Sequence, residues 1–199
     1  RGCFVEKMEE TENGYCRVKL ANGVSGFVPE VALRKRLDSD RFLWGKSEER
    51  FFVEQGIPEG WSEEKFRRKV VECAKGYLGC QYRWGGKAAD GIDCSGVVFM
   101  VYLMNGVLIW RDADIREGYP MKAIWREGEE MCLVEERAKA GDLLFWRGHV
   151  GMYLGDGRDL HCTGHERVFG CRVNSLQRGD ADFRKDLAEA LKVVGSVFS

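Results

Sequence analysis

The chain has 199 residues, a formal net charge of −1 at pH 7 and 44% hydrophobic residues. This length and apolar content suit one or two packed domains, and the charge gives no support to a nucleic-acid-binding or polybasic membrane-binding protein. No apolar run reaches the length of a membrane span, and no signal peptide is visible. Because the chain begins at Arg1 rather than at methionine, the sequence leaves open whether the protein works in the cytoplasm or is exported.

Eight cysteines raise the question of disulfides or a metal site. Their spacing contains no C-x-x-C pair and no finger-like pattern, so we predict mostly reduced thiols and no bound metal. Cys3 and Cys16 lie in neighbouring predicted strands, where pairing brings two thiols within reach of each other. The sequence does not determine whether they are joined.

Residues 1–36 are predicted to form short strands and turns. The predicted elements are Cys3–Glu6, Gly14–Leu20, an Asn22-Gly23 turn, and Ser25–Pro29. This pattern resembles the later part of a bacterial SH3-like barrel, and an N-terminal hairpin packed on the next domain is the alternative. Residues 37–61 have no clear period and are interpreted as a connector, so residues 62–199 form the second predicted domain.

Two helices are predicted in the middle of the chain. The first begins at Ser62, a favourable N-cap, and continues to Gly79 with one apolar stripe. The second follows Asp93, its predicted N-cap, and stops at Asn105-Gly106. Cys94 therefore stands in the first helical turn, where the helix dipole and unpaired backbone N–H groups lower the pKa of a thiol.

Three strands are predicted next, at 141–146, 149–154 and 159–163, and a helical stretch at 181–194 ends the chain. Because a nucleophilic thiol needs a base, we interpret Cys94, His149 and His161 as nucleophile, base and orienting group. Both histidines must then lie on one face of the sheet. Strand parity predicts a three-residue connection at 155–157 or an equivalent bulge, which places His161 opposite Gly151.

A helix before a run of antiparallel strands predicts an α+β fold. Four segments carry a family resemblance, namely Tyr82-Arg83-Trp84-Gly85-Gly86, Asp93-Cys94-Ser95-Gly96, Gly141-Asp142-Leu143-Leu144-Phe145, and residues 149–161 from His149 to His161. Together, over residues 70–176, they resemble the NlpC-type bacterial cell-wall cysteine peptidases. The resemblance implies a papain-like core with the nucleophile-bearing helix packed on an antiparallel sheet.

The resemblance also implies roles for side chains around the thiol. Tyr82 would donate its hydroxyl to the oxyanion, and substrate contacts would come from Asp93, Ser95, Trp84, Asp112 and Ala113. Two residues depart from the family, because Trp110 replaces a proline and Ala113 replaces a serine whose hydroxyl helps hold the D-glutamyl α-carboxylate. A structural role is the alternative in each case, such as a buried thiol for Cys94, a strand-edge histidine for His149 or helix capping for Asp93.

The predicted activity is hydrolysis of the amide between the γ-carboxyl of D-glutamate and the following diamino acid in peptidoglycan stem peptides. L-Ala-γ-D-Glu-diamino acid is the implied substrate, and no metal or organic cofactor is implied. A cysteine amidase or acyltransferase acting on a different amide or ester is one alternative. A non-catalytic wall-binding protein that uses its SH3-like segment is the other, although the intact Cys94, His149 and His161 argue against it.

Overall fold

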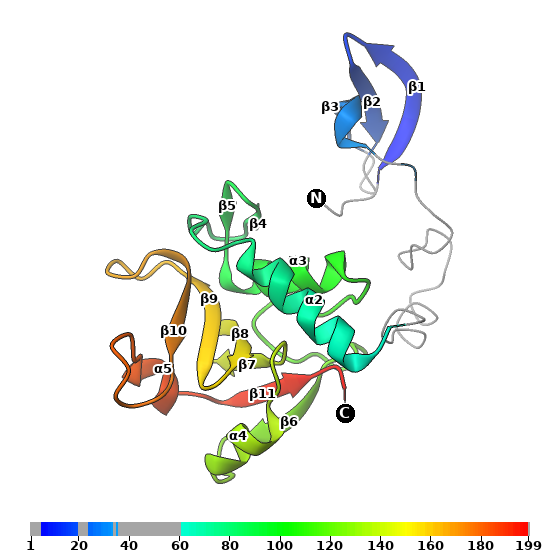
Figure 1. The fold of residues 1–199 in the computed structure, drawn as a ribbon. Helices are drawn as coiled ribbons and strands as arrows, with labels where there is room; N and C mark the ends of the chain where they lie inside the picture. Colours follow the sequence, from blue (N-terminus) through cyan, green and yellow to red (C-terminus); the bar gives the residue numbers. More distant parts are fainter. Residues whose placement is uncertain (1–4, 20–23, 34, 36–60, 199) are drawn as a thin grey trace. The chain divides into compact units, whose positions relative to one another are not determined.

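The computed structural model describes residues 5–19, 24–33, 35 and 61–198 (Figure 1). The chain divides into two compact units, Arg1–Leu43 and Trp44–Ser199. Apart from Trp61, the predicted connector at 37–61 lies outside the described residues. Within the described ranges, no helix is long and apolar enough to cross a membrane.

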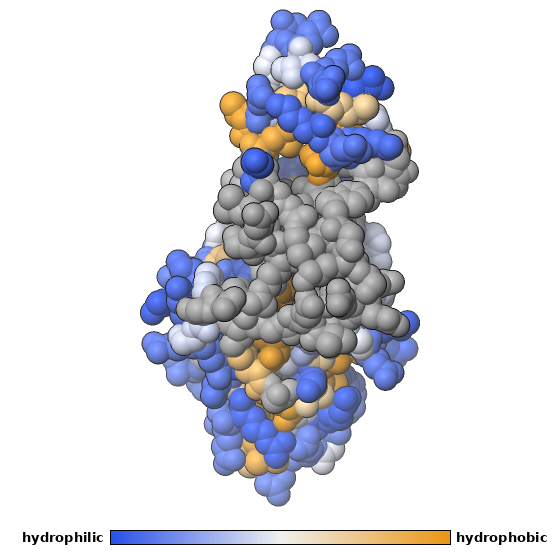
Figure 2. Space-filling model, turned by 90° about the vertical axis from the view of Figure 1, so that its right-hand side faces the viewer, coloured by the Kyte–Doolittle hydropathy of each residue, from blue (hydrophilic) through white to orange (hydrophobic). Residues whose placement is uncertain are grey.

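The N-terminal unit contains a three-stranded antiparallel sheet, in the order β1-β2-β3. Its elements are β1 Glu6–Glu12, β2 Tyr15–Lys19, β3 Ser25–Pro29 and a 3-10 turn at Glu30–Ala32. Asn13 and Gly14 join β1 to β2 with positive φ angles of 51° and 79°, as a tight hairpin turn requires. In Figure 2 its surface is largely hydrophilic, with hydrophobic side chains among the charged ones.

Two predictions for this unit are only partly tested. Strands β2 and β3 confirm the predicted strands near Gly14–Leu20 and at Ser25–Pro29, but the first strand begins at Glu6 and runs on to Glu12. Cys3 and the Asn22-Gly23 turn lie outside the described residues. The SH3-like barrel therefore stays a prediction.

The larger unit is built on a six-stranded sheet in the order β10-β9-β8-β7-β11-β6. Its strands are β6 Lys122–Arg126, β7 Leu143–Trp146, β8 His149–Gly155, β9 Arg158–Thr163, β10 Gly170–Ser175 and β11 Val193–Ser196, with a small β4 Lys87–Ala88 and β5 Gly91–Ile92 pair beside it. Its helices are α2 Glu63–Lys75, α3 Cys94–Met104, α4 Cys132–Arg137 and α5 Lys185–Glu189. This confirms the predicted α+β class (Figure 1).

Each face of the sheet has its own hydrophobic core. Val150 and Met152 of β8 pack with apolar residues of α2 and α3 on one face. Tyr153 of β8 and Trp146 of β7 pack with Val134 of α4 and residues of α5 on the other. Because side chains alternate along a strand, the residues that share parity with Tyr153 lie on the α5 face.

Helices α2 and α3 form where the sequence predicts them, although α2 ends at Lys75 rather than at Gly79. Ser62 caps α2 by accepting from the backbone N–H of Lys65 at 3.2 Å, and α3 begins at Cys94 after the cap Asp93. Helix α3 is apolar around most of its circumference, which explains why it lies buried between α2 and the sheet.

The prediction of a helix over 181–194 is wrong in its second half. The helix α5 covers only Lys185–Glu189, and Val193–Ser196 forms β11, which pairs antiparallel with β7 and β6. Val194 is completely buried between those strands. The β-branched Val193 and Val194 suit a central strand better than a helix, and sheet pairing decides between the two.

A buried ion pair fastens α2 to the start of β7. Arg67 Nη1 lies 2.8 Å from Asp142 Oδ1, and these side chains are only 11% and 1% exposed. Asp142 Oδ2 also accepts from the backbone N–H of Lys139 at 2.8 Å. Because both charges have left water, removing Asp142 leaves Arg67 with the half-exposed Glu63, at 2.8 Å, as its remaining ion-pair partner.

We therefore expect Asp142→Ala to lower the free energy of unfolding by roughly 1.5–3 kcal/mol. The exposed Lys69–Glu72 pair is the matched control, and Glu72→Ala should cost less than about 1 kcal/mol. Urea denaturation of both variants measures the difference. Similar small losses in the two variants would contradict a structural role for the buried pair.

Candidate active site

Asp93 fixes the start of α3 and thereby the position of Cys94. Its Oδ1 accepts from the backbone N–H of Gly96 at 2.6 Å, and its Oδ2 accepts from the N–H of Gly85 at 2.7 Å. The helix cap is thus confirmed, and it also holds the loop that contains Gly85. Cys94 follows as the first helical residue and is 8% exposed.

The expectation that the helix start lowers the pKa of Cys94 is wrong in its net direction. Burial raises the pKa of the Cys94 thiol above its ordinary value, and the backbone N–H groups of Val150, Ser95 and Cys94 itself oppose this only in part. The negative charge of Asp93 raises it further. Cys94 therefore rests as a thiol and needs a base to become a nucleophile.

The contribution from Val150 connects the thiol to the histidines. A backbone N–H can stabilise the thiolate only from hydrogen-bonding distance, so the start of β8 lies against Cys94. His149 is the first residue of β8 and directly precedes Val150. The structure therefore brings the nucleophile candidate next to the strand that carries the base candidate.

A bulge in the β8–β9 hairpin sets the positions of the two histidines. His161 pairs opposite Gly151, and the register shifts between Tyr153 and Gly155. Asp156 and Gly157 make the turn with positive φ angles of 51° and 64°. The predicted pairing of His161 with Gly151 is confirmed, by the bulge rather than by a simple three-residue loop.

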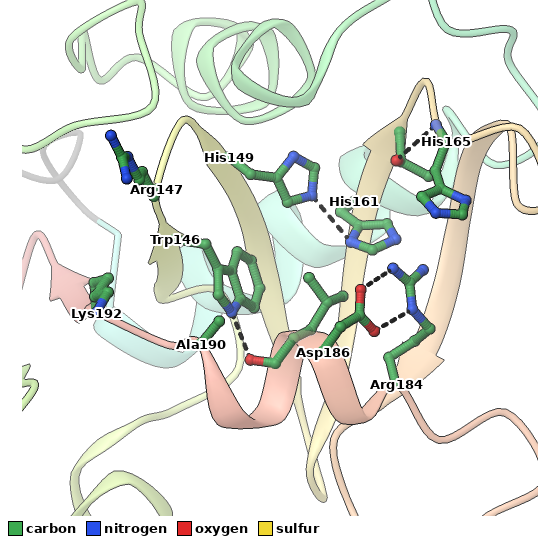
Figure 3. A pocket seen from close by; sticks show the side chains of 11 residues that line it. Trp146, Arg147, His149, His161, His165, Arg184, Asp186, Ala190 and Lys192 are labelled. Atoms are coloured by element: carbon green, nitrogen blue, oxygen red, sulfur yellow. Dashed lines mark hydrogen bonds and ion pairs between the residues drawn. The ribbon is translucent and has the colours of Figure 1, made fainter.

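The two imidazole rings contact each other on the α5 face of the sheet (Figure 3). His149 Nε2 lies 3.2 Å from His161 Nδ1, and the rings meet edge to face at 68°. Trp146 packs against the His149 ring with centroids 5.5 Å apart. When Nε2 of His149 carries the proton it donates to His161, which leaves Nδ1 of His149 as a free acceptor.

Both histidines are neutral at physiological pH. Burial first, and then the positive charge of Arg184, lower the pKa of His149 to about 4. Burial likewise lowers the pKa of His161 to about 3, with help from His149 and Arg184. A neutral imidazole is the form that can accept a proton, as general-base catalysis requires.

Tyr82 lies close to Cys94. It forms a bridge with Ile92, two residues before the thiol, and its ring packs edge to face on Phe169 with centroids 6.1 Å apart. Burial first, and then the negative charges of an ionised Cys94 and of Asp93, raise the pKa of Tyr82. Its hydroxyl therefore stays protonated and remains a hydrogen-bond donor.

Arg111 is a residue of the site that the sequence analysis did not single out. Its guanidinium donates to both oxygens of Asp93, at 3.0 and 3.2 Å, and to Ser95 Oγ at 2.6 Å. Because the oxygens of Asp93 also accept backbone N–H groups, Asp93 acts as a structural anchor here. Arg111 could have been found from the sequence, because it stands between Trp110 and Asp112 in the loop that resembles the family.

The remaining predicted substrate contacts differ in exposure. Trp84 is 86% exposed and Asp112 is exposed, whereas Ala113 is half-buried and packs against the main core. Trp110 stacks edge to face on Tyr119, with centroids 5.3 Å apart, and Arg116 lies over its ring. The substituted loop is therefore held in place by aromatic packing.

A cavity of about 410 Å³ opens beside the two histidines. Figure 3 shows Trp146, His149 and His161 along one side of it, and the ion pair of Arg184 with Asp186 along α5 on the other. Arg184 Nε and Nη2 donate to the Asp186 carboxylate at 2.7 and 2.6 Å. His165, which has no motif around it, also lines this cavity.

Comparison with known proteins identifies the family. The sequence model of the NlpC/P60 family matches residues 79–180, which contain Tyr82, Cys94, His149 and His161. A solved structure of an NlpC/P60 family protein from Bacillus cereus ATCC 10987 shares the fold, with a TM-score of 0.55 and 20% identity over 98% of this chain and 54% of that one.

Two curated relatives are enzymes by name. Dipeptidyl-peptidase 6 of Lysinibacillus sphaericus is 44% identical over 139 residues, which are 69% of this chain and 47% of that protein. Gamma-D-glutamyl-L-lysine dipeptidyl-peptidase of Bacillus subtilis (strain 168) is 36% identical over 119 residues, which are 55% of this chain and 37% of that protein. The chain thus spans about half the length of these relatives or less.

Proposed function

This chain belongs to the NlpC/P60 family, and on that premise we propose that it is a cysteine peptidase of peptidoglycan peptides. The bond cleaved is the amide between the γ-carboxyl of D-glutamate and the following diamino acid. The observation that carries the proposal is Cys94 at a helix start beside β8, the strand that presents His149 hydrogen-bonded to His161. The name of the B. subtilis relative supports the choice of bond.

The chemistry begins with a neutral pair. Nδ1 of His149 accepts the proton of the Cys94 thiol while the sulfur attacks the γ-carbonyl carbon, because neither group is ionised at rest. His161 holds the His149 ring through Nε2, at 3.2 Å. The imidazolium formed in this step then protonates the leaving amine, which departs as the free diamino acid end of the peptide.

The oxyanion and the second half of the reaction use the same side chains. The Tyr82 hydroxyl and backbone N–H groups at the start of α3 stabilise the negative oxygen, and one such donor contributes about 2.7–4 kcal/mol to lowering the barrier. The thioester that remains joins Cys94 to the L-Ala-D-Glu acyl group. Neutral His149 then activates water, which hydrolyses the thioester and restores the thiol.

The substrate-binding side of the site is formed by the Arg111 loop. Asp112 keeps an exposed carboxylate that suits the free ammonium of an N-terminal L-alanine. Ser95 offers its hydroxyl, already bound to Arg111, to the D-glutamyl portion. Trp84 forms an exposed apolar wall, and Ala113 contributes no hydroxyl, so it leaves the α-carboxylate with one donor fewer than in relatives that carry serine.

Ala113 and Trp110 favour a second candidate, a cysteine amidase or acyltransferase with the same nucleophile and a different acyl group. Mass spectrometry of products separates the candidates. The proposed enzyme releases L-Ala-D-Glu from both L-Ala-γ-D-Glu-L-Lys and its meso-diaminopimelate counterpart. It leaves the isomer linked through the α-carboxyl of D-glutamate uncut. If neither γ-linked peptide were cleaved, the proposal would be refuted.

A further inference from the structure

A buried polar layer lies behind the two histidines, on the α5 face of β9 and β10. Within the described residues, six buried side-chain atoms have no aligned hydrogen-bond partner, and all belong to β9, β10 or Arg184, although Asn174 interacts with His161 closely enough to raise the pKa of that imidazole. They are Asp159 Oδ1 and Oδ2, His161 Nε2, Arg172 Nε, Asn174 Oδ1 and Arg184 Nη1. Because an unsatisfied buried polar group destabilises a fold, such a concentration in one place marks a functional region.

Asp159 is the carboxylate of this layer. It is 0% exposed, and it precedes His161 by two residues in β9, so both side chains point to the same face. Asp159 Oδ2 lies 3.2 Å from His161 Nδ1. The two groups are close in distance but not aligned as a hydrogen bond, since His161 Nδ1 already faces His149 Nε2 at the same 3.2 Å.

Gly151 of β8, which pairs with His161, lies against this contact. A side chain at Gly151 would place its Cβ 3.4 Å from Asp159 Oδ2 and 3.2 Å from His161 Cβ. The closest contact would be with the backbone oxygen of Leu160, at 3.1 Å, so glycine at this position lets β8 lie close to β9 over the carboxylate and the imidazole. The arrangement follows from the backbone register, in which Gly151 pairs with His161.

We infer that Asp159 is a positioning residue that acts on His149 through His161. This inference rests on the proposed function. When His149 takes the proton of Cys94, positive charge appears on its ring and spreads through the hydrogen bond to His161. A carboxylate 3.2 Å from His161 Nδ1 stabilises that charge by electrostatic attraction, without a hydrogen bond to the ring.

The groups around Asp159 determine when it carries its charge. Burial raises the pKa of Asp159 to about 7, opposed by the positive charges of Arg184 and Arg158 and reinforced by Asp182. Facing it across the strands are His161 in β9, Tyr153 in β8 and Asn174 in β10, with Arg172 opposite His161. For His149 itself, Arg184 disfavours a proton and Asp186, which pairs with Arg184, favours one.

If Asp159 served only to stabilise the fold, removing its charge would lower the stability of the protein. The raised pKa of Asp159 predicts the opposite. An acid with a raised pKa binds its proton more tightly in the folded state than in the unfolded state. The free energy of unfolding then falls as pH rises from the ordinary carboxyl range through about 7. Removing the charge should therefore not lower the melting temperature at pH 8, even though it lowers reactivity.

The test is the rate at which iodoacetamide alkylates Cys94, followed by mass mapping between pH 5 and 9. This rate needs no peptide substrate, so it can be measured whether or not the proposed hydrolysis is found. We expect Asp159→Asn to react about tenfold more slowly at pH 8, the effect of one pKa unit on His149. We also expect the parent protein to show an inflection near pH 7 that the variant lacks.

Two comparisons keep the result specific. Asp156→Asn, in the exposed turn at a φ of 51° that asparagine tolerates, should react like the parent protein. In a His161→Asn background, adding Asp159→Asn should change the rate less than twofold, because the positioning acts through His161. An Asp159→Asn rate within twofold of the parent, or an undiminished tenfold loss in the His161→Asn background, would overturn the inference.

Discussion

Cys94→Ala is expected to reduce hydrolysis of L-Ala-γ-D-Glu-L-Lys by on the order of 10⁴-fold or more, because it removes the group that bonds to the γ-carbonyl carbon. The fold should remain, since the truncation is small and the helix cap depends on Asp93 rather than on the thiol. Product release measured by mass spectrometry, with a melting curve of the same sample, gives both results.

Cys132→Ala is the matched control for this experiment. Cys132 is an exposed free thiol at the start of α4, so its removal should leave the rate of hydrolysis unchanged. If Cys94→Ala retained turnover while remaining folded, the thiol would not be the nucleophile. A loss in both cysteine variants would instead indicate general damage to the protein.

His149→Ala is expected to lower kcat by about 10³-fold, within the range that a positioned general base contributes. The parent enzyme should also lose activity as pH falls through about 4, because the protonated form of His149 cannot accept the proton of Cys94. Burial lowers the pKa of His149, so this acid limb lies below that of an exposed histidine.

Initial rates between pH 3.5 and 7, each repeated after return to pH 7, separate titration from unfolding. The repeat is needed because neutral buried histidines weaken the fold as pH falls below their ordinary pKa. Asp156→Asn, a change in the exposed turn between β8 and β9, serves as the comparison and should keep both the rate and the acid limb. A complete loss of activity near pH 6.5 in the parent, rather than the partial step near pH 7 expected from Asp159, would contradict the assignment of His149.

Local sequence signals were sufficient for the elements that carry the site. Ser62 and Asp93 are side-chain caps, and each sits where its helix begins. The parity of β8 and β9 also followed from the sequence, because two histidines that serve one thiol must share a face and a simple two-residue hairpin would place them on opposite faces. Both kinds of signal act over a few residues, which is why they can be recognised without tertiary information.

The sequence-based predictions were wrong or incomplete where tertiary packing determines the secondary structure, the pKa or the contacts of a residue. The strand at Val193–Ser196 exists because β7 and β6 leave a place between them, which no local period reveals. The pKa of Cys94 depends on how deeply the helix start is buried, and burial outweighs the backbone N–H groups. Arg111 and Asp159 became visible only when distant segments met, at Asp93 for one and at His161 for the other.

The most direct test of Cys94 as nucleophile is to trap its thioester. The protein is mixed with L-Ala-γ-D-Glu-L-Lys, quenched with acid during turnover, and its cysteine-containing peptides are weighed. We predict the added mass of an L-Ala-D-Glu acyl group on the peptide that contains Cys94, none on the peptide that contains Cys132, and none in Cys94→Ala. Hydrolysis at an unchanged rate in Cys94→Ala, or an acyl group bound to a different residue, would contradict the mechanism.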